Sequence, residues 1–307
     1  MFDTLITAQK PLLRVWAIAD LQQGMPSMIE ECLRYGVEDI AALDLGLDAI
    51  WYLGDATEGK RSAVVNESVA IQQQLLGSLQ VPVRFIMGNH DLDCARNQSP
   101  GEAPILPMWQ AVAQDPQWRT TDTPQDFFFL EEHGPWLVVF LSDHIAADCS
   151  WLVSWNDILG QHPERYPHHH SAWQALRTRI AAWDGPVILA GHYAFPGGTR
   201  GGNLDSLHAR LMPFSPNVGL VLHGHAHLGD FAYGHEQCYR RMSYVDYHDL
   251  AQVNVSSLDR TRGSQSRSAI IDLHADHSIS IWFRDHEDRC WTDALQRNCA
   301  APRTLSP

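Results

Sequence analysis

The sequence lacks the features that mark membrane-spanning or secreted proteins. Its longest apolar runs have the length of a strand, far short of the roughly 18 residues that a membrane helix needs. Residues 1–16 do not combine a basic start, a long apolar segment and a small-residue cleavage site, so we expect no signal peptide. The six cysteines include no C-x-x-C pair. We therefore expect free thiols and a cytoplasmic protein.

The chain also has little positive charge. Its 22 Lys and Arg residues against 36 Asp and Glu residues give a formal net charge of −14. This charge argues against a surface that binds the nucleic acid backbone. An anionic substrate would likewise need a local source of positive charge, and the 17 histidines point to bound metal as that source.

Six apolar runs, each followed by polar residues, dominate the first 230 positions. Their β-branched and aromatic content and their continuous hydrophobicity predict strands buried on both faces. The runs cover residues 12–20, 47–55, 81–91, 135–144, 184–195 and 217–227.

Helical patterns lie between these runs. They cover residues 28–46, with Ser27 as the expected N-cap, and residues 62–79 and 171–183. Alternating strands and helices predict a largely parallel sheet with right-handed crossovers. In such sheets, functional groups gather beyond the carboxyl ends of the strands.

The pattern changes after residue 230. Residues 240–259 and 268–283 indicate antiparallel strands, the second pair turning near Ala275–Asp276. We expect one domain over residues 1–285 and a loosely held C-terminal tail over 286–307. An insert over 94–126, with a short helix around Trp109, is either a substrate cap or a passive surface insertion.

The polar residues at the strand ends are those that hold paired divalent metals. Two ions about 3.5–4 Å apart need a bridging carboxylate and several oxygen or nitrogen donors, and Asp, His and Asn suit Mn, Fe or Zn. Alone, Asp20 would be read as a helix cap, and His192 as a buried histidine with a protein partner. Together, at successive strand ends, such residues predict one metal-binding site. The candidates are Asp20, Asp55, Asn89, His90, His192, His225 and His227.

Five short blocks, in this order, resemble the five sequence blocks of the calcineurin-like metallophosphoesterase superfamily over residues 13 to about 230. They are Asp20-Leu21-Gln22, Gly54-Asp55, Gly88-Asn89-His90-Asp91, Gly191-His192 and Gly224-His225-Ala226-His227. The resemblance implies an α/β fold, a two-sheet αββα sandwich with flanking helices. It also implies a dimetal site at the carboxyl ends of the strands.

The resemblance also assigns roles. Asp55 would bridge two ions, and His90, oriented by Asp91, would act as a general acid or stabilise the developing oxyanion. The first ion would be completed by Asp20, Gln22 and His227, and the second by Asn89, His192 and His225. A metal-bound hydroxide would then attack phosphorus in line.

Gln22 departs from the family pattern, which has histidine two residues after the aspartate. An amide oxygen is a harder and weaker donor than an imidazole nitrogen, which favours Mn, or Mg, over Zn at the first site. This variant is similar to the Mn-dependent ADP-ribose/CDP-alcohol diphosphatase branch. In the alternative, Gln22 points away and water takes its coordination position.

Other residues carry smaller expectations. Arg200, in the glycine-rich stretch 195–203, would bind a substrate phosphate, or the stretch is simply a flexible loop. His144 follows a strand and would either face the site or lie at the surface, and we expect the surface position. We expect His168–His170 in solvent. His223 would at most support a metal ligand.

The resemblance implies hydrolysis of a phosphoester or diphosphate bond in a small phosphorylated molecule, with two divalent ions as cofactor. A cyclic-nucleotide phosphodiesterase would use the same residues. A protein phosphatase is possible, although the insert after Asp91 would narrow access to the site. In a different class, the fold would serve as a non-catalytic binding scaffold. No nucleic-acid or membrane partner is expected, and the oligomeric state stays open.

Overall fold

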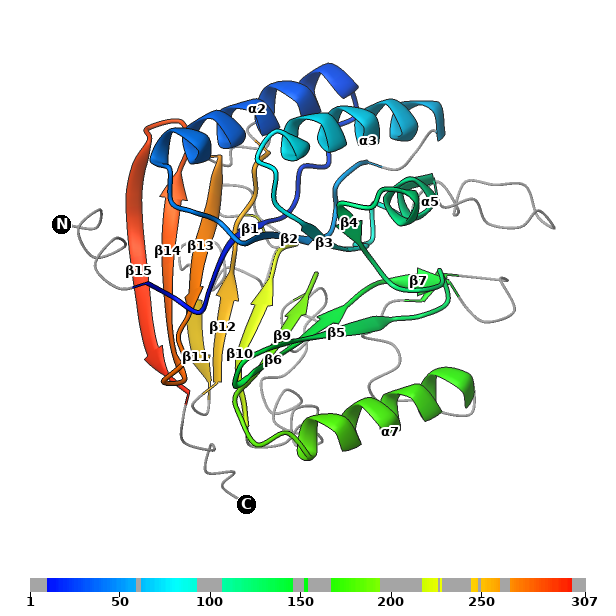
Figure 1. Ribbon diagram of the computed structural model, residues 1–307. Helices are drawn as coiled ribbons and strands as arrows, with labels where there is room; N and C mark the ends of the chain where they lie inside the picture. The colour runs from blue at the N-terminus through cyan, green and yellow to red at the C-terminus, as the bar shows by residue number, and fades with distance from the viewer. Residues whose placement is uncertain are drawn as a thin grey trace.

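The computed structural model describes residues 10–58, 62–92, 107–145, 152–153, 167–193, 217–225, 227, 244–247, 250–259 and 266–299. These residues form two mixed β-sheets packed face to face, with helices on both outer faces (Figure 1). The architecture is the αββα sandwich that the resemblance implies. No helix in this described part of the chain is both long and apolar enough to cross a membrane.

Sheet A has seven strands within the described residues, in the order β15-β14-β13-β1-β2-β3-β4. Strands β1 to β4 run parallel, and β13 to β15 add antiparallel to the other side of β1. The bounds are β1 Leu13–Ile18, β2 Ala49–Leu53, β3 Val83–Ile86, β4 Trp118–Arg119, β13 Arg267–Leu273, β14 Ser278–Asp285 and β15 Cys290–Asn298.

Sheet B has six described strands, in the order β11-β12-β10-β9-β6-β5. Its four central strands are parallel, and an antiparallel strand closes each edge. The bounds are β5 Phe128–His133, β6 Trp136–Leu141, β9 Val187–Gly191, β10 Val218–His223, β11 Tyr244–Tyr247 and β12 Leu250–Asn254. A separate short pair joins β7 His144–Ile145 to β8 Leu152–Val153.

All six apolar runs are strands, as predicted: β1, β2, β3, β6, β9 and β10. The antiparallel pair β11–β12 and the hairpin β13–β14 are also confirmed. Helices α2 Pro26–Leu43, α3 Ser62–Gly77 and α5 Pro107–Gln114 lie over sheet A, whereas α7 Pro167–Ala181 covers sheet B (Figure 1).

Three apolar layers hold the sandwich together. One lies between the helices and sheet A, one between the sheets, and one between α7 and sheet B. In the central layer, Trp51 of β2 meets Phe140 of β6 edge-on, with 5.4 Å between ring centroids. Both rings are fully buried. Burial of side chains of this size contributes about 1.5–3 kcal/mol each, so the central layer fixes the spacing of the two sheets.

Some predicted boundaries are wrong. The helix predicted over 171–183 begins earlier, as α7 at Pro167, so His168–His170 lie in its first turn. Helix α2 begins at Pro26 with Met25 as its N-cap, so Ser27 lies inside its first turn. Proline suits this position because the first N–H of a helix has no partner to lose. In the predicted tail 286–307, Cys290–Asn298 form β15, which pairs with β14 along its length. As a mostly exposed edge strand, β15 lacks the apolar run by which the buried strands are identified.

The predicted helix around Trp109 is α5, whereas residues 94–106 of the insert lie outside the described residues. The expectation of solvated histidines is wrong for His144 and His169, which are 0% and 3% exposed. Their rings meet edge-on at 4.5 Å between centroids, and His169 Nε2 donates to the carbonyl of Gln125 at 3.2 Å. This hydrogen bond to a backbone carbonyl far away in the sequence compensates the cost of burying the His169 ring.

A buried polar network ties α2 to sheet A. Arg284 donates to both carboxylate oxygens of Asp39 at 2.8 Å, and His286 Nδ1 donates to Asp39 at 2.9 Å. His286 Nε2 accepts from the Ser268 hydroxyl at 2.7 Å, which in turn accepts from Trp16 Nε1 at 2.7 Å. A neutral His286 protonated on Nδ1 satisfies each of these contacts.

Asp39→Asn should lower the free energy of unfolding at pH 7 by about 2–4 kcal/mol, because it leaves the buried Arg284 without its counter-charge. Burial alone would raise the pKa of Asp39, but hydrogen bonds from Arg284 and His286 outweigh it and lower the pKa to about 2. The stabilisation is therefore complete above the unfolded-state pKa of about 4 and is lost as pH falls through about 2. Urea unfolding of the wild-type protein and of Asp39→Asn at pH 7 and pH 3 measures this stabilisation. The difference between their free energies of unfolding should be smaller at pH 3.

Asp44→Asn is the matched control. Asp44 is exposed at the end of the same helix with φ 47°, a conformation that asparagine also adopts readily. We expect a change within about 0.5 kcal/mol for this variant. Equal losses in the two variants, or no loss in Asp39→Asn, would contradict the role of the network.

Candidate metal centre

The predicted metal residues follow strands of both sheets at one end of the sandwich. Asp20, Asp55 and Asn89 come after β1, β2 and β3 of sheet A, whereas His192 and His225 follow β9 and β10 of sheet B. Two cross-sheet hydrogen bonds join the ends: His192 Nδ1 donates to the Leu53 carbonyl at 2.8 Å, and the His225 N–H donates to Asp20 Oδ2 at 2.8 Å. The topology thus brings together side chains that are far apart in the sequence.

Left-handed turns direct these side chains. Asp20, Asp55, His225 and His227 have φ values of 56°, 54°, 65° and 41°. Such conformations are uncommon outside glycine and cost about 1–3 kcal/mol each. They persist here because the turns support one another, as when the His90 N–H donates to Asp55 Oδ1 at 2.8 Å.

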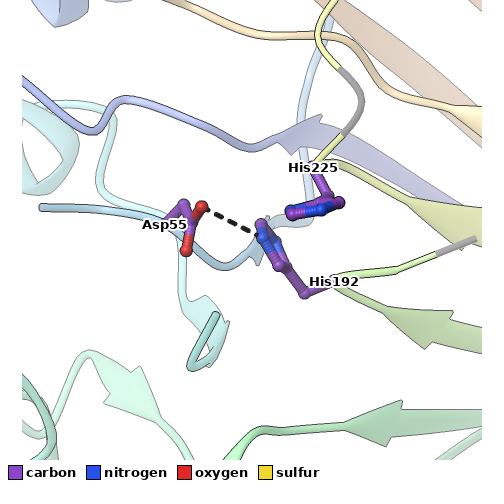
Figure 2. Close-up of side chains that lie close together, drawn as sticks. All are labelled: Asp55, His192 and His225. Carbon is purple, nitrogen blue, oxygen red and sulfur yellow. Dashed lines mark ion pairs between the residues drawn. The ribbon is translucent and has the colours of Figure 1, made fainter. Parts of the chain in front are cut away.

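One half of the centre contains Asp55, His192 and His225. Their potential ligand atoms all lie within 4.8 Å of one another. Figure 2 shows the two imidazoles together, with His192 directed at the Asp55 carboxylate, and His192 Nε2 lies 3.1 Å from Asp55 Oδ2. Because Nδ1 of His192 donates to a carbonyl, Nε2 is the ring atom left to bind a metal.

The other half contains Asp20, Gln22 and His227, which are all buried. His227 Nε2 lies 3.6 Å from Asp20 Oδ1 and 3.0 Å from Gln22 Nε2. The Gln22 amide therefore points toward the His227 ring. Since the two ends of an amide are alike in shape, the same position suits its oxygen.

The donor set fits divalent cations. Among the described residues, the buried Asp20 Oδ1 has no hydrogen-bond partner. Burial and the charge of Asp55 raise the pKa of Asp20 well above its ordinary value. Burial would lower the pKa of His192, but the Asp55 and Asp20 carboxylates raise it to about 10. Two buried carboxylates with oxygen and nitrogen donors around them form a site that requires positive charge.

Asp91 is buried, whereas Asn89 and His90 are partly exposed. Its carboxylate accepts the backbone N–H groups of Gly88 at 2.9 Å and Thr57 at 3.1 Å. These bonds fix the loop that carries Asn89 and His90 against the loop that carries Asp55. The orientation of the His90 ring by Asp91 stays a prediction, and Arg200 lies outside the described residues.

Sequence reasoning missed three supporting residues. Tyr193 packs edge-on against His192 and His225, and its hydroxyl lies 2.8 Å from Asp143 Oδ2. The Ser257 hydroxyl donates to the Asp20 carbonyl at 2.8 Å. Tyr193 directly follows a predicted ligand, and Asp143 lies at the end of a predicted strand. Their positions in the sequence could therefore have indicated that both lie near the site.

Residues 13–229 match the family model described as calcineurin-like phosphoesterase. A search of curated protein sequences gives no match. Among solved structures, the chain is similar to a dimetal phosphatase from Danio rerio, with 13% identity and a TM-score of 0.60 over 94% of this chain and 99% of that chain.

Two further solved structures share the fold. Purple acid phosphatase PPD1 from yellow lupin has 12% identity and a TM-score of 0.54, covering 97% of this chain and 57% of that one. GAP50, the anchor in the inner membrane complex of Plasmodium, has 14% identity and a TM-score of 0.56, covering 93% and 88%. At these identities the similarities show the fold alone.

Gly88→Ala should disrupt the metal centre. A Cβ at this position would collide with Asp55 Oδ1 and lie 2.7 Å from the Asp55 backbone nitrogen, so the two loops would have to separate. We expect the variant to lose most of its bound divalent metal, measured by elemental analysis after dialysis against Mn²⁺. Gly77→Ala, at the end of α3, is the control, because its Cβ would meet only Gln117 Oε1 at 3.4 Å. Full metal content in Gly88→Ala would contradict the close-approach argument.

Proposed function

This chain belongs to the calcineurin-like phosphoesterase family, and we propose that it hydrolyses a phosphoester or diphosphate bond in a small phosphorylated molecule. The family and its fold imply a metal-dependent phosphohydrolase with a dinuclear centre. The observation that carries the proposal is the convergence of Asp55, His192 and His225 within 4.8 Å beside a second cluster of donors.

The donors divide between two ions. Asp20, Gln22 and His227 would hold the first, and Asn89, His192 and His225 the second, with Asp55 shared. When bound, the ions would neutralise charge on the phosphoryl oxygens and lower the pKa of water. They would also supply the positive field that a chain of net charge −14 lacks.

His90 is the proposed general acid. Its backbone N–H donates to Asp55 at 2.8 Å, which places the residue beside the shared carboxylate. The residue is partly exposed, so a substrate can reach it. From there its imidazole would give a proton to the leaving-group oxygen or stabilise charge that develops on it. Arg200 stays a candidate for binding substrate phosphate.

Other activities use the same residues. A cyclic-nucleotide phosphodiesterase needs the same metal centre, so the substrate decides between them. A binding scaffold is the alternative of another class, since the similar GAP50 structure is named as an anchor. The retained set of donors favours catalysis, because a binding scaffold has no need for two buried carboxylates surrounded by metal-type donors. Within the described part of the chain, Cys290 and Cys299 form no disulfide, which supports the proposed cytoplasmic location.

The purified chain, stripped of metal and resupplied with Mn²⁺, should hydrolyse a bis-aryl phosphate, and Asp55→Asn should reduce kcat by at least about 100-fold, because the shared ligand loses its charge. A panel of monoesters, cyclic diesters and nucleoside diphosphate conjugates such as ADP-ribose then identifies the substrate class. Asp44→Asn is the control for the same chemical change at the surface. Absence of turnover with any divalent metal would favour the scaffold.

Gln22→His should shift metal preference from Mn²⁺ toward Zn²⁺, by about tenfold or more in the ratio of the dissociation constants, because imidazole is the softer donor. Competition binding of the two metals to metal-free protein measures the ratio without relying on turnover. Gln23→His is the matched control, since Gln23 is also buried and adjacent but lies outside the predicted ligand position. An unchanged ratio in Gln22→His would mean that Gln22 does not bind the metal.

A further inference from the structure

Tyr193 contacts three of the four residues proposed for the second ion. Its ring lies edge-on to His192 at 5.0 Å and to His225 at 4.8 Å between centroids. Its hydroxyl lies 3.4 Å from Asn89 Oδ1. The side chain is 7% exposed, and the apolar part of the ring packs into the layer between sheet B and α7. The hydroxyl is thus a buried polar group directed at the metal centre.

The tyrosine hydroxyl has one proton to donate, and two acceptors within hydrogen-bond distance of it are among the residues that the structure describes. The Asp143 carboxylate oxygen is at 2.8 Å, a normal hydrogen-bond length, whereas the Asn89 contact is 3.4 Å. The proton therefore goes to Asp143, whose carboxylate accepts hydrogen bonds more strongly than an amide does. Toward Asn89, the tyrosine oxygen can then act only as an acceptor.

This assignment decides which end of the Asn89 amide faces the tyrosine. Only the amide NH₂ can donate to the tyrosine oxygen, and the oxygen and nitrogen of an amide occupy nearly identical positions. The structure places Oδ1 nearest the hydroxyl, and exchanging the two ends of the amide puts the NH₂ group on the tyrosine side and turns the carbonyl oxygen away from it. A divalent metal binds the carbonyl oxygen and not the NH₂ group.

The loops that carry Asp143 and Asn89 are tied together. The Met87 N–H donates to the Ser142 hydroxyl at 2.9 Å, and the Asp143 N–H donates to the Met87 carbonyl at 3.0 Å. Asn89 follows Met87 by two residues, so the carboxylate and the amide are held at a fixed separation. Tyr193, two residues beyond the end of β9, contacts both of them.

We propose that Tyr193 and Asp143 are positioning residues that fix the Asn89 amide with its oxygen available to the second metal. This inference rests on the proposed ligand role of Asn89. The proposal gives a role to the hydrogen bonds of the Tyr193 hydroxyl with Asp143 and Asn89. Packing alone would not require this hydroxyl, because a phenyl ring would fill the same space.

Tyr193→Phe tests the proposal, since it keeps the ring contacts and removes only the hydroxyl. In metal-free protein, the side-chain ¹⁵N–¹H₂ resonance of Asn89 should shift in Tyr193→Phe, because its hydrogen bond is lost. Calorimetric titration with Mn²⁺ should show the affinity of one site reduced by about 10- to 100-fold and the other unchanged. Tyr52→Phe is the control, because its buried hydroxyl donates to Gln72 at 2.8 Å. It should change neither readout.

Asn89→Ala distinguishes the proposed ligand role of Asn89 from the positioning role of Tyr193. It should weaken the same Mn²⁺ site, and Tyr193→Phe added to it should weaken that site no further. If Asn89→Ala weakens one site while Tyr193→Phe alters neither affinity nor resonance, the positioning role is overturned and the proposed ligand stands. If Asn89→Ala leaves both sites unchanged, the ligand role and the positioning role both fall. Equal weakening of both sites by Tyr193→Phe would indicate a structural role and also overturn the proposal.

Discussion

The buried carboxylates of Asp20 and Asp55 are the constraint on which the rest of the structure depends. Each occupies a left-handed turn, and each accepts a backbone N–H from another block of the centre. Burying a carboxylate is costly unless hydrogen bonds and opposite charge compensate it. The backbone donors and His192 compensate part of this cost, and divalent cations are the counter-charge that the donor set suits. The strained turns are stable because the loops around them form one hydrogen-bonded unit.

The sandwich brings together two sets of side chains that could bind metal. Sheet A supplies carboxylate and amide oxygens from Asp20, Gln22, Asp55 and Asn89, and sheet B supplies the imidazoles. Among the proposed metal ligands, neither sheet alone carries both kinds of donor. The separation of the sets is fixed by the central apolar layer, in which Trp51 meets Phe140 a few residues below the site. Core packing and metal geometry are therefore coupled, because protein interiors resist small changes in spacing.

Much of this fold could be predicted because buried parallel strands appear as continuous apolar runs. The candidate ligand residues could be identified because they follow those runs directly and match a known order of blocks, and their ligand roles stay predictions. The edge strand β15 could not, since its exposed faces leave no apolar pattern. The burial of His169 could not either, because its partner is a carbonyl 44 residues away. Sequence patterns show which apolar residues are buried, but polar burial depends on tertiary partners that no local pattern contains.

Gln22 shows how a change of one donor can leave the framework intact. The backbone turn at Asp20, the bond from His225 to its carboxylate and the approach of His227 are all present with an amide at position 22. The geometry of the site therefore does not require histidine there, and the amide takes a buried place that a metal ligand could occupy. The same fold can support different chemistries. Glutamine in place of histidine therefore changes the electronic character of one donor and leaves the fold unchanged. Its consequence is expected in the choice of metal, where oxygen and nitrogen donors differ most.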